Sequence, residues 1–333
     1  MSEVLEILEE KNVIDDHLLD IIGNEFKFSH EKGLSEWLKN SADAYLRASR
    51  EDEESLIFFR FEDKNKSTDE VIFECIDFVG MTSDDIDNAL KRWGDPEAAK
   101  RGTSKRVFGG HGNGGKFYMR QMFRQSHFIT YRSGKLNVFG FNENRRYGFA
   151  KGFKDKKVNP DDAMKFAEIY DLDLPLNIRK EILDGITGFT VARGIHPTNV
   201  TKKKFNLDKL CEKFKHYPQS RLILKYKPVS IIYNEKIFNQ RITPEEITPK
   251  PEFEKPIEIS IPQTIIWEEY KDKETILLTN EKYPQGKLIL YTSYEPLSRN
   301  SRLGDLNRID ITGGIGVIAS YKIQELDYIK HRT

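Results

Sequence analysis

The chain has only two cysteines in 333 residues, Cys75 and Cys211, far apart and outside any CxxC pair. This spacing excludes a disulfide framework and a cysteine-based zinc centre, so we expect two buried, reduced thiols. Net charge is also lacking, because 53 basic residues balance 53 acidic ones. A dedicated nucleic-acid or membrane-surface binder would carry an excess of positive charge. The balanced charge argues against both classes, although local basic patches remain possible.

Long apolar runs are absent as well. No stretch of the sequence approaches the roughly 18 apolar residues that a membrane span needs. Residues 1–20 are acidic and have neither the basic start nor the apolar core of a secretion signal. We therefore expect a cytoplasmic protein without a membrane partner. Since domains usually run to roughly 100–200 residues, the length suggests two domains.

Helix and strand patterns mix without regular alternation along the first part of the chain. Apolar residues at helical spacing predict helices at 1–22, 33–49 and 116–123. Short apolar runs predict hairpins of strands at 55–61 with 71–76 and 127–131 with 136–141, and a strand at 186–192. This irregular mixture favours the α+β class, as an α/β sandwich with a mixed, mostly antiparallel sheet.

The pattern changes at residues 194–204, where His196-Pro197 and three lysines interrupt it. We therefore expect a first domain over residues 1–195 and a smaller α/β domain over residues 196–333. In this second part the sequence predicts a helix at 207–215 and strands at 222–227, 229–233, 257–261, 265–269, 275–278 and 287–292.

Three polar residues share one face of the helix predicted at 33–49. At about 100° per residue, Asn40 lies about 40° from Glu36, and Asp43 lies about 20° to its other side. A carboxylate can polarise an attacking water, and a carboxamide oxygen can ligate Mg²⁺. A solvated polar helix face is the alternative interpretation.

An acidic residue ends one apolar strand, and a threonine lies in another. The carboxylate of Asp77 can accept a hydrogen bond from the exocyclic amine of a base, and Gly80, before Met81, lets the backbone approach a ligand. Thr190 lies in the strand predicted at 186–192. The alternatives are a turn-capping aspartate and an ordinary strand threonine.

A glycine-dense loop precedes the helix predicted at 116–123. Five of its seven residues are glycine, and a lysine follows: Gly109, Gly110, His111, Gly112, Asn113, Gly114, Gly115 and Lys116. Such a loop can direct several backbone N–H groups at an anion, and the lysine adds a positive charge for phosphate. The Gly-Lys-Ser/Thr ending of a Walker A loop is missing. A plain flexible loop is the alternative, and His111 suits a steric or hydrogen-bonding role better than that of a base.

In their order and spacing, these features resemble the GHKL superfamily of gyrase, heat-shock chaperone, histidine kinase and MutL proteins. The segment EWLKNSADA resembles the N-box of that family, GGHGNGGK its second glycine box and GFT its threonine strand. The glycine loop is closest to MORC-type and gyrase-type members, and the resemblance covers roughly residues 15–195. The first glycine box departs from the family pattern, since the segment after Asp77 lacks one glycine and is one residue short.

The resemblance implies a Bergerat-type ATP-binding domain followed by a transducer-like domain. Adenine would lie against Asp77 and Thr190, beside Gly80 and Met81. Asn40 would hold Mg²⁺, with Asp43 on the same helix, and Glu36 would deprotonate the attacking water. Residues 109–116 would cradle the phosphates, and residues 81–108 would form a short helix and a loop that closes as a lid.

The resemblance also implies slow ATP hydrolysis coupled to homodimerisation, with a protein client or DNA as the downstream partner. A nucleotide-binding sensor that hydrolyses little is the alternative, and the carboxylate of Glu36 argues against it. DNA maintenance, chromatin-like remodelling, protein folding and bacterial antiphage defence are all open as pathways. The compact chain and the mixture of MORC-type and gyrase-type motifs favour defence.

Overall fold

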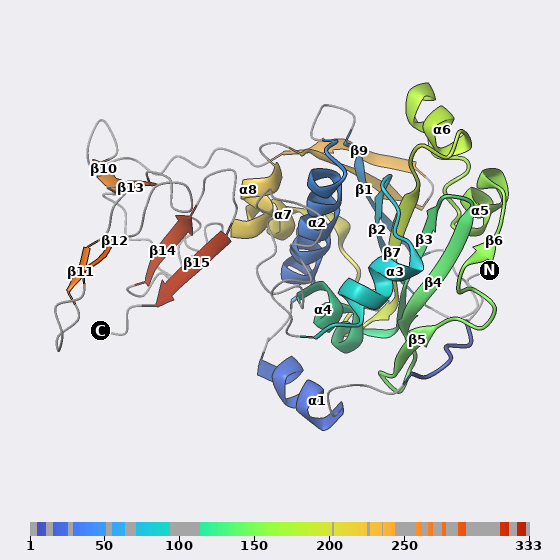
Figure 1. Ribbon diagram of the computed structural model, residues 1–333, viewed down its shortest axis with the longest axis horizontal. Coiled ribbons are helices and arrows are strands. Elements are labelled where there is room, and N and C mark those ends of the chain that lie inside the picture. The colour runs from blue at the N-terminus through green and yellow to red at the C-terminus, as the bar shows by residue number, and fades with distance from the viewer. Residues whose placement is uncertain are drawn as a thin grey trace. The chain divides into compact units, whose positions relative to one another are not determined.

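A computed structural model describes most of the first 243 residues and, beyond them, six strands between Ile257 and Lys330. The described ranges before the strands are 5–10, 16–25, 29–50, 55–63, 71–93, 114–201, 203–224, 227–234 and 236–243. The chain divides into two compact units, Met1–Glu245 with Ile323–Leu326, and Glu246–Lys322 with Asp327–Thr333. Figure 1 shows the elements of both units.

One sheet is the centre of the first unit. Its described strands are β1 (Ile57–Glu62), β2 (Ile72–Asp77), β3 (Phe123–Arg132), β4 (Lys135–Phe141), β5 (Tyr147–Phe149), β6 (Lys156–Lys157), β7 (Phe189–Pro197), β8 (Val229–Tyr233) and β9 (Lys236–Ile242). They lie in the order β5-β4-β3-β7-β2-β1-β8-β9, with β6 beside β4. β1 and β8 pair in parallel, and the other described pairings are antiparallel. The predicted α+β class with a mixed, mostly antiparallel sheet is confirmed.

Helices cover both faces of this sheet. The described helices are α1 (Asp16–Glu25), α2 (His30–Arg47), α3 (Ser83–Asp85), the π-helix η1 (Ile86–Leu90), α4 (Gly114–Met122), α5 (Pro160–Phe166), α6 (Leu176–Leu183), α7 (Leu207–His216) and α8 (Pro218–Leu224). α2, α4, α7 and α8 pack on one face, while α5 and α6 pack on the other (Figure 1). The fold is therefore a sandwich with two apolar layers. None of the described helices is both long and apolar enough to cross a membrane.

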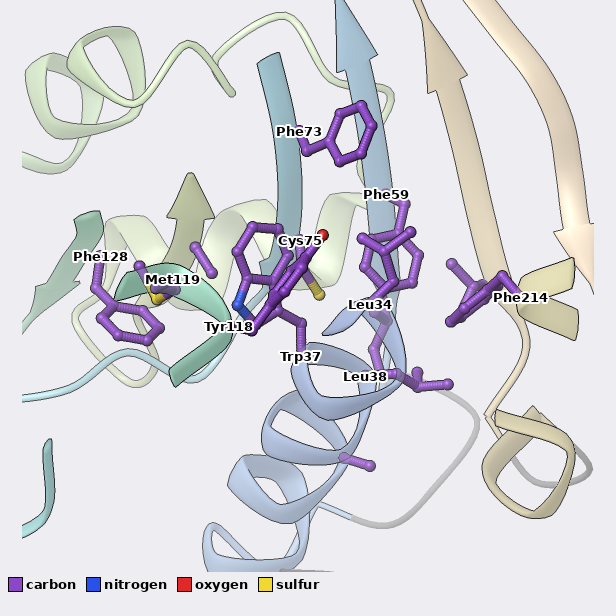
Figure 2. Packing of buried hydrophobic residues seen from close by; sticks show 14 of the residues in the cluster. Leu34, Trp37, Leu38, Phe59, Phe73, Cys75, Tyr118, Met119, Phe128 and Phe214 are labelled. Carbon is purple, nitrogen blue, oxygen red and sulfur yellow. The ribbon is translucent and has the colours of Figure 1, made fainter. Parts of the chain in front are cut away.

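α2 is the most deeply embedded of these helices. Ser29 caps its start by accepting a hydrogen bond from the backbone N–H of Lys32. Its apolar side chains Leu34, Trp37 and Leu38 are almost fully buried and meet α4 and the sheet (Figure 2). Glu36 and Asp43 of its polar face are buried as well, and Asn40 is half-buried, so this face is not simply a solvated surface.

The start of the chain differs from the helix predicted there. Leu8 N–H donates to the Phe149 carbonyl and Glu10 N–H to the Tyr147 carbonyl, each at 2.9 Å, so residues 5–10 lie extended beside β5. Ile7 is buried in the apolar layer beneath α5 and α6. The prediction of a helix over these residues is wrong, because the free edge of β5 offers backbone partners that the local apolar spacing does not reveal.

Two further expectations in the middle of the chain are not met. The boundary expected at residue 195 falls inside β7, a central strand, and the first unit continues to Glu245 because β8 completes the sheet beside β1. The strand expected at 222–227 is wrong as well, since α8 runs to Leu224. Both differences depend on packing between residues far apart in sequence, which apolar spacing does not report.

The described strands beyond residue 245 form short antiparallel pairs. They are β10 (Ile257–Ile261), β11 (Ile266–Glu268), β12 (Thr275–Leu277), β13 (Gly286–Leu290), β14 (Gly314–Ala319) and β15 (Glu325–Lys330). β10 pairs with β13, β11 with β12 and β14 with β15. The four strands predicted between 257 and 292 are thus present, while their identity as a transducer-like domain stays a prediction.

Candidate functional site

The first two residues of α4 lie directly against two polar residues of α2. A Cβ atom added at Gly114 would stand 2.2 Å from Glu36 Oε2, and one added at Gly115 would stand 2.4 Å from Asn40 Nδ2. Real Cβ atoms do not approach other atoms so closely, so a side chain at either glycine would displace the end of Glu36 or Asn40. The end of the predicted glycine loop and the predicted polar helix face therefore meet in space.

The carboxylate of Glu36 is nearly buried, at 7% exposure, and lies beside a lysine of its own helix. Lys39 Nζ is 2.6 Å from Glu36 Oε2. One turn earlier, burial lowers the pKa of Lys32, while the charge of Glu36 opposes that effect. Asn40, one turn further along α2, is half-buried.

Lys116 is buried, at 3% exposure, although it follows the glycines directly. Its Nζ donates to the backbone carbonyl of Arg92 and lies 4.8 Å from the centre of the Trp93 ring. Both partners belong to residues 82–93, which contain α3 and η1. In this structure the expected phosphate-binding lysine therefore contacts the segment that begins the expected lid.

Asp77 ends β2 directly opposite Thr190 of β7 in the strand register. Ser41 Oγ donates to Asp77 Oδ2 at 2.9 Å, and the backbone N–H of Val79 donates to Oδ1 at 3.3 Å. Burial raises the pKa of the Asp77 carboxyl to about 7, although both of these hydrogen bonds favour the charged form. Because Ser41 follows Asn40 in α2, one helix contacts both the glycines of α4 and the buried carboxyl.

A second threonine, which the sequence did not single out, joins the strands at this end. Thr130 of β3 is fully buried, and its Oγ1 lies 3.1 Å from Thr190 Oγ1 and accepts a hydrogen bond from Met81 N–H at 2.6 Å. Its only sequence signal was a polar residue inside an apolar strand. Gly80, before Met81, has a φ of +81°, and a Cβ there would lie 2.3 Å from the Tyr131 carbonyl oxygen.

Of the remaining predicted residues, Asp43 is buried in α2, two positions beyond Ser41. The short helix expected after residue 82 is present as α3, which Thr82 and Asp85 cap reciprocally. Residues 94–113 lie outside the described part of the chain. This range includes most of the expected lid and the loop residues Gly109, Gly110, His111, Gly112 and Asn113.

The polar groups of this site could bind a magnesium ion only together with the phosphates of a bound nucleotide. Within the described ranges, no three His, Cys, Asp or Glu side chains gather in a way that could hold a metal. The oxygens of Asn40 and Glu36 are nevertheless of the hard type that Mg²⁺ prefers, and Mg²⁺ is usually bound by one or two protein groups, substrate phosphates and water. The donor set therefore suits a phosphate-bound Mg²⁺.

Comparison with protein-family models finds no match to this chain, and comparison with curated proteins finds none either.

Proposed function

We propose that this chain is a Mg²⁺-dependent ATP-binding protein of the GHKL kind that hydrolyses ATP slowly. The observation that carries the proposal is the packing of Gly114 and Gly115 on Glu36 and Asn40. This contact brings together a candidate proton acceptor, a candidate magnesium ligand and the start of a helix. Helix N-termini favour phosphate binding, because their free N–H groups point outward.

The base end of the nucleotide is assigned to Asp77 and Thr190. The Asp77 carboxylate would accept a hydrogen bond from the 6-amino group of adenine, with Ser41 holding its other oxygen. The carbonyl oxygen that guanine carries at this position would meet the carboxylate as a second acceptor. ATP should therefore bind more tightly than GTP, because a site built around one hydrogen bond discriminates against an analogue that lacks it.

The phosphate end is assigned to Asn40, Lys116 and Glu36. When bound, Mg²⁺ would neutralise charge on the phosphate oxygens, and Asn40 would be its protein ligand. Glu36 would accept the proton of the attacking water, and Lys39 would hold its carboxylate in place. The nucleotide state would then gate homodimerisation and engagement of a protein client or DNA. Antiphage defence is the biological setting that we favour.

A non-hydrolysing nucleotide sensor is the second candidate. The contact between Lys39 and Glu36 favours it, since a carboxylate oxygen that contacts an ammonium is not free to contact a water. Calorimetry with ATP and GTP, with and without Mg²⁺, tests binding, and a phosphate-release assay tests hydrolysis. Mg²⁺-dependent ATP binding with turnover supports the ATPase. Binding without turnover supports the sensor, and absence of ATP binding rejects both.

A further inference from the structure

We infer that the contact of Lys116 with residues 82–93 is an autoinhibitory latch that the phosphates of a nucleotide must break. The inference rests on the proposed function, because it takes Lys116 as a phosphate ligand. What it adds is a contact of this lysine that competes with the phosphates. In the structure Lys116 Nζ contacts the Arg92 carbonyl and the Trp93 ring.

The Trp93 ring that Lys116 contacts is held in place, because it packs against the sheet and α4. Its ring centre lies 4.9 Å from that of Phe117 in α4 and 6.2 Å from that of Phe141 in β4. A cation over the face of a tryptophan is attracted by the ring, most strongly where water is excluded. Since Lys116 is buried, we expect this attraction to stabilise the contact.

The segment that carries Arg92 and Trp93 is also fixed one residue earlier. Lys91 pairs with Glu10 of the extended N-terminal residues and with Asp87 of η1, the latter at 2.6 Å, and its Nζ lies 4.6 Å from the centre of the Phe149 ring. Residues 82–93 are thereby tied to the edge of the sheet. η1 is a π-helix, a form that often marks functional positions.

A nucleotide changes the balance because phosphate oxygens are stronger partners for an ammonium than a neutral carbonyl is. Binding would move Lys116 away from Arg92 and Trp93 and so release this end of residues 82–93. Part of the binding free energy would be used to break the latch. Weakening the latch should consequently tighten ATP binding, whereas damage to a binding site weakens it.

The test is a double-mutant cycle on the full chain, with Trp93→Leu, Lys116→Met and the double variant. Calorimetry with a non-hydrolysable ATP analogue and Mg²⁺ gives each dissociation constant. We expect Trp93→Leu to bind about fivefold more tightly than the wild type, from the usual worth of a cation–π contact. Lys116→Met should bind more weakly, and Trp93→Leu should bring no tightening in that background.

Two results would overturn the latch. One is an affinity of Trp93→Leu equal to or weaker than that of the wild type, and the other is tightening that persists without Lys116. If the wild type binds ATP and either result appears, only the latch fails, whereas a wild type that does not bind ATP removes the proposed function.

If Trp93→Leu does not fold, Trp93→Phe and tryptophan emission replace it. The analogue should shift the emission of the wild type, and this shift should be clearly smaller in Trp93→Phe, where only the other tryptophans, Trp37 of α2 among them, still report. A shift of undiminished size in Trp93→Phe, or no shift in a wild type that binds, contradicts the inference.

Discussion

Asp77 is an acidic residue placed where a charge is costly. Its carboxyl is almost completely buried, and Ser41 and the Val79 N–H are the donors described around it. Two hydrogen bonds offset only part of the desolvation, so burial raises its pKa to about 7. Near neutral pH the residue is thus divided between two forms, of which only the charged one can accept a hydrogen bond through both oxygens.

This shift predicts how stability depends on pH. In the unfolded chain Asp77 titrates near the ordinary value of 3.8, and in the folded chain near 7, so the folded state binds more protons between these values. The contribution of Asp77 to stability is complete below about pH 4 and is lost as the pH rises through 7. Thermal unfolding of the wild type and of Asp77→Asn at pH 5 and pH 8 measures it. The wild type should lose stability relative to the variant at pH 8, and an unchanged difference contradicts the assignment.

Glu36 allows a second prediction at the scale of a residue. If it accepts a proton from water, Glu36→Ala should bind ATP almost normally and lose hydrolysis by a factor of roughly 10² or more. Phosphate release at saturating ATP measures this loss. Lys39→Met is the matched control, because it removes the ion pair and keeps the carboxylate. Wild-type turnover in Glu36→Ala would show that another group takes the proton.

The contact between α2 and α4 leads to a prediction at the scale of elements. Gly115→Ala places a methyl carbon 2.4 Å from the present position of Asn40 Nδ2, so the end of the Asn40 side chain must shift. We expect Mg²⁺-dependent ATP binding to weaken by about tenfold or more, as when a ligand is misplaced by a fraction of an ångström. Calorimetry with and without Mg²⁺ measures the change.

Gly152→Ala is the control for this substitution. A Cβ there meets nothing within 4 Å, and the strain of its positive φ of 76° affects stability alone. If Gly115→Ala and Gly152→Ala bind ATP with equal Mg²⁺-dependent affinities, Asn40 is not a ligand of the metal.

Elements whose apolar faces are set by neighbours in sequence could be predicted from the sequence. The hairpin of β1 and β2 and the helix α2 are examples, since a period of two or of 3.6 is visible within one window. The extended residues 5–10 and the helix α8 could not be predicted, because distant partners decide both. In the site, Glu36 and Asn40 could be predicted because they belong to a motif. Thr130 could not, because only the pairing of β3 with β7 brings it next to Thr190.

At the scale of the whole molecule, the proposed function predicts a change of assembly. Release of residues 82–93 from Lys116 would change the surface beside the nucleotide, and identical chains most often use such a surface in a two-fold dimer. We expect a monomer or weak dimer without nucleotide and a dimer with a non-hydrolysable ATP analogue. Light scattering at several protein concentrations measures the mass. An identical mass in both conditions would contradict the change of assembly but not the proposal that the chain binds ATP.

The parallel pairing of β1 with β8 has a consequence for the chain during its synthesis. Ile57 leaves the ribosome long before Val229, its partner in the sheet. At usual translation rates this interval is on the order of ten seconds. Throughout it, β1 has an unpaired edge with Phe59 and Phe61 beside it, which other nascent chains can join. The yield of folded protein should therefore depend on how fast the ribosome reaches β8.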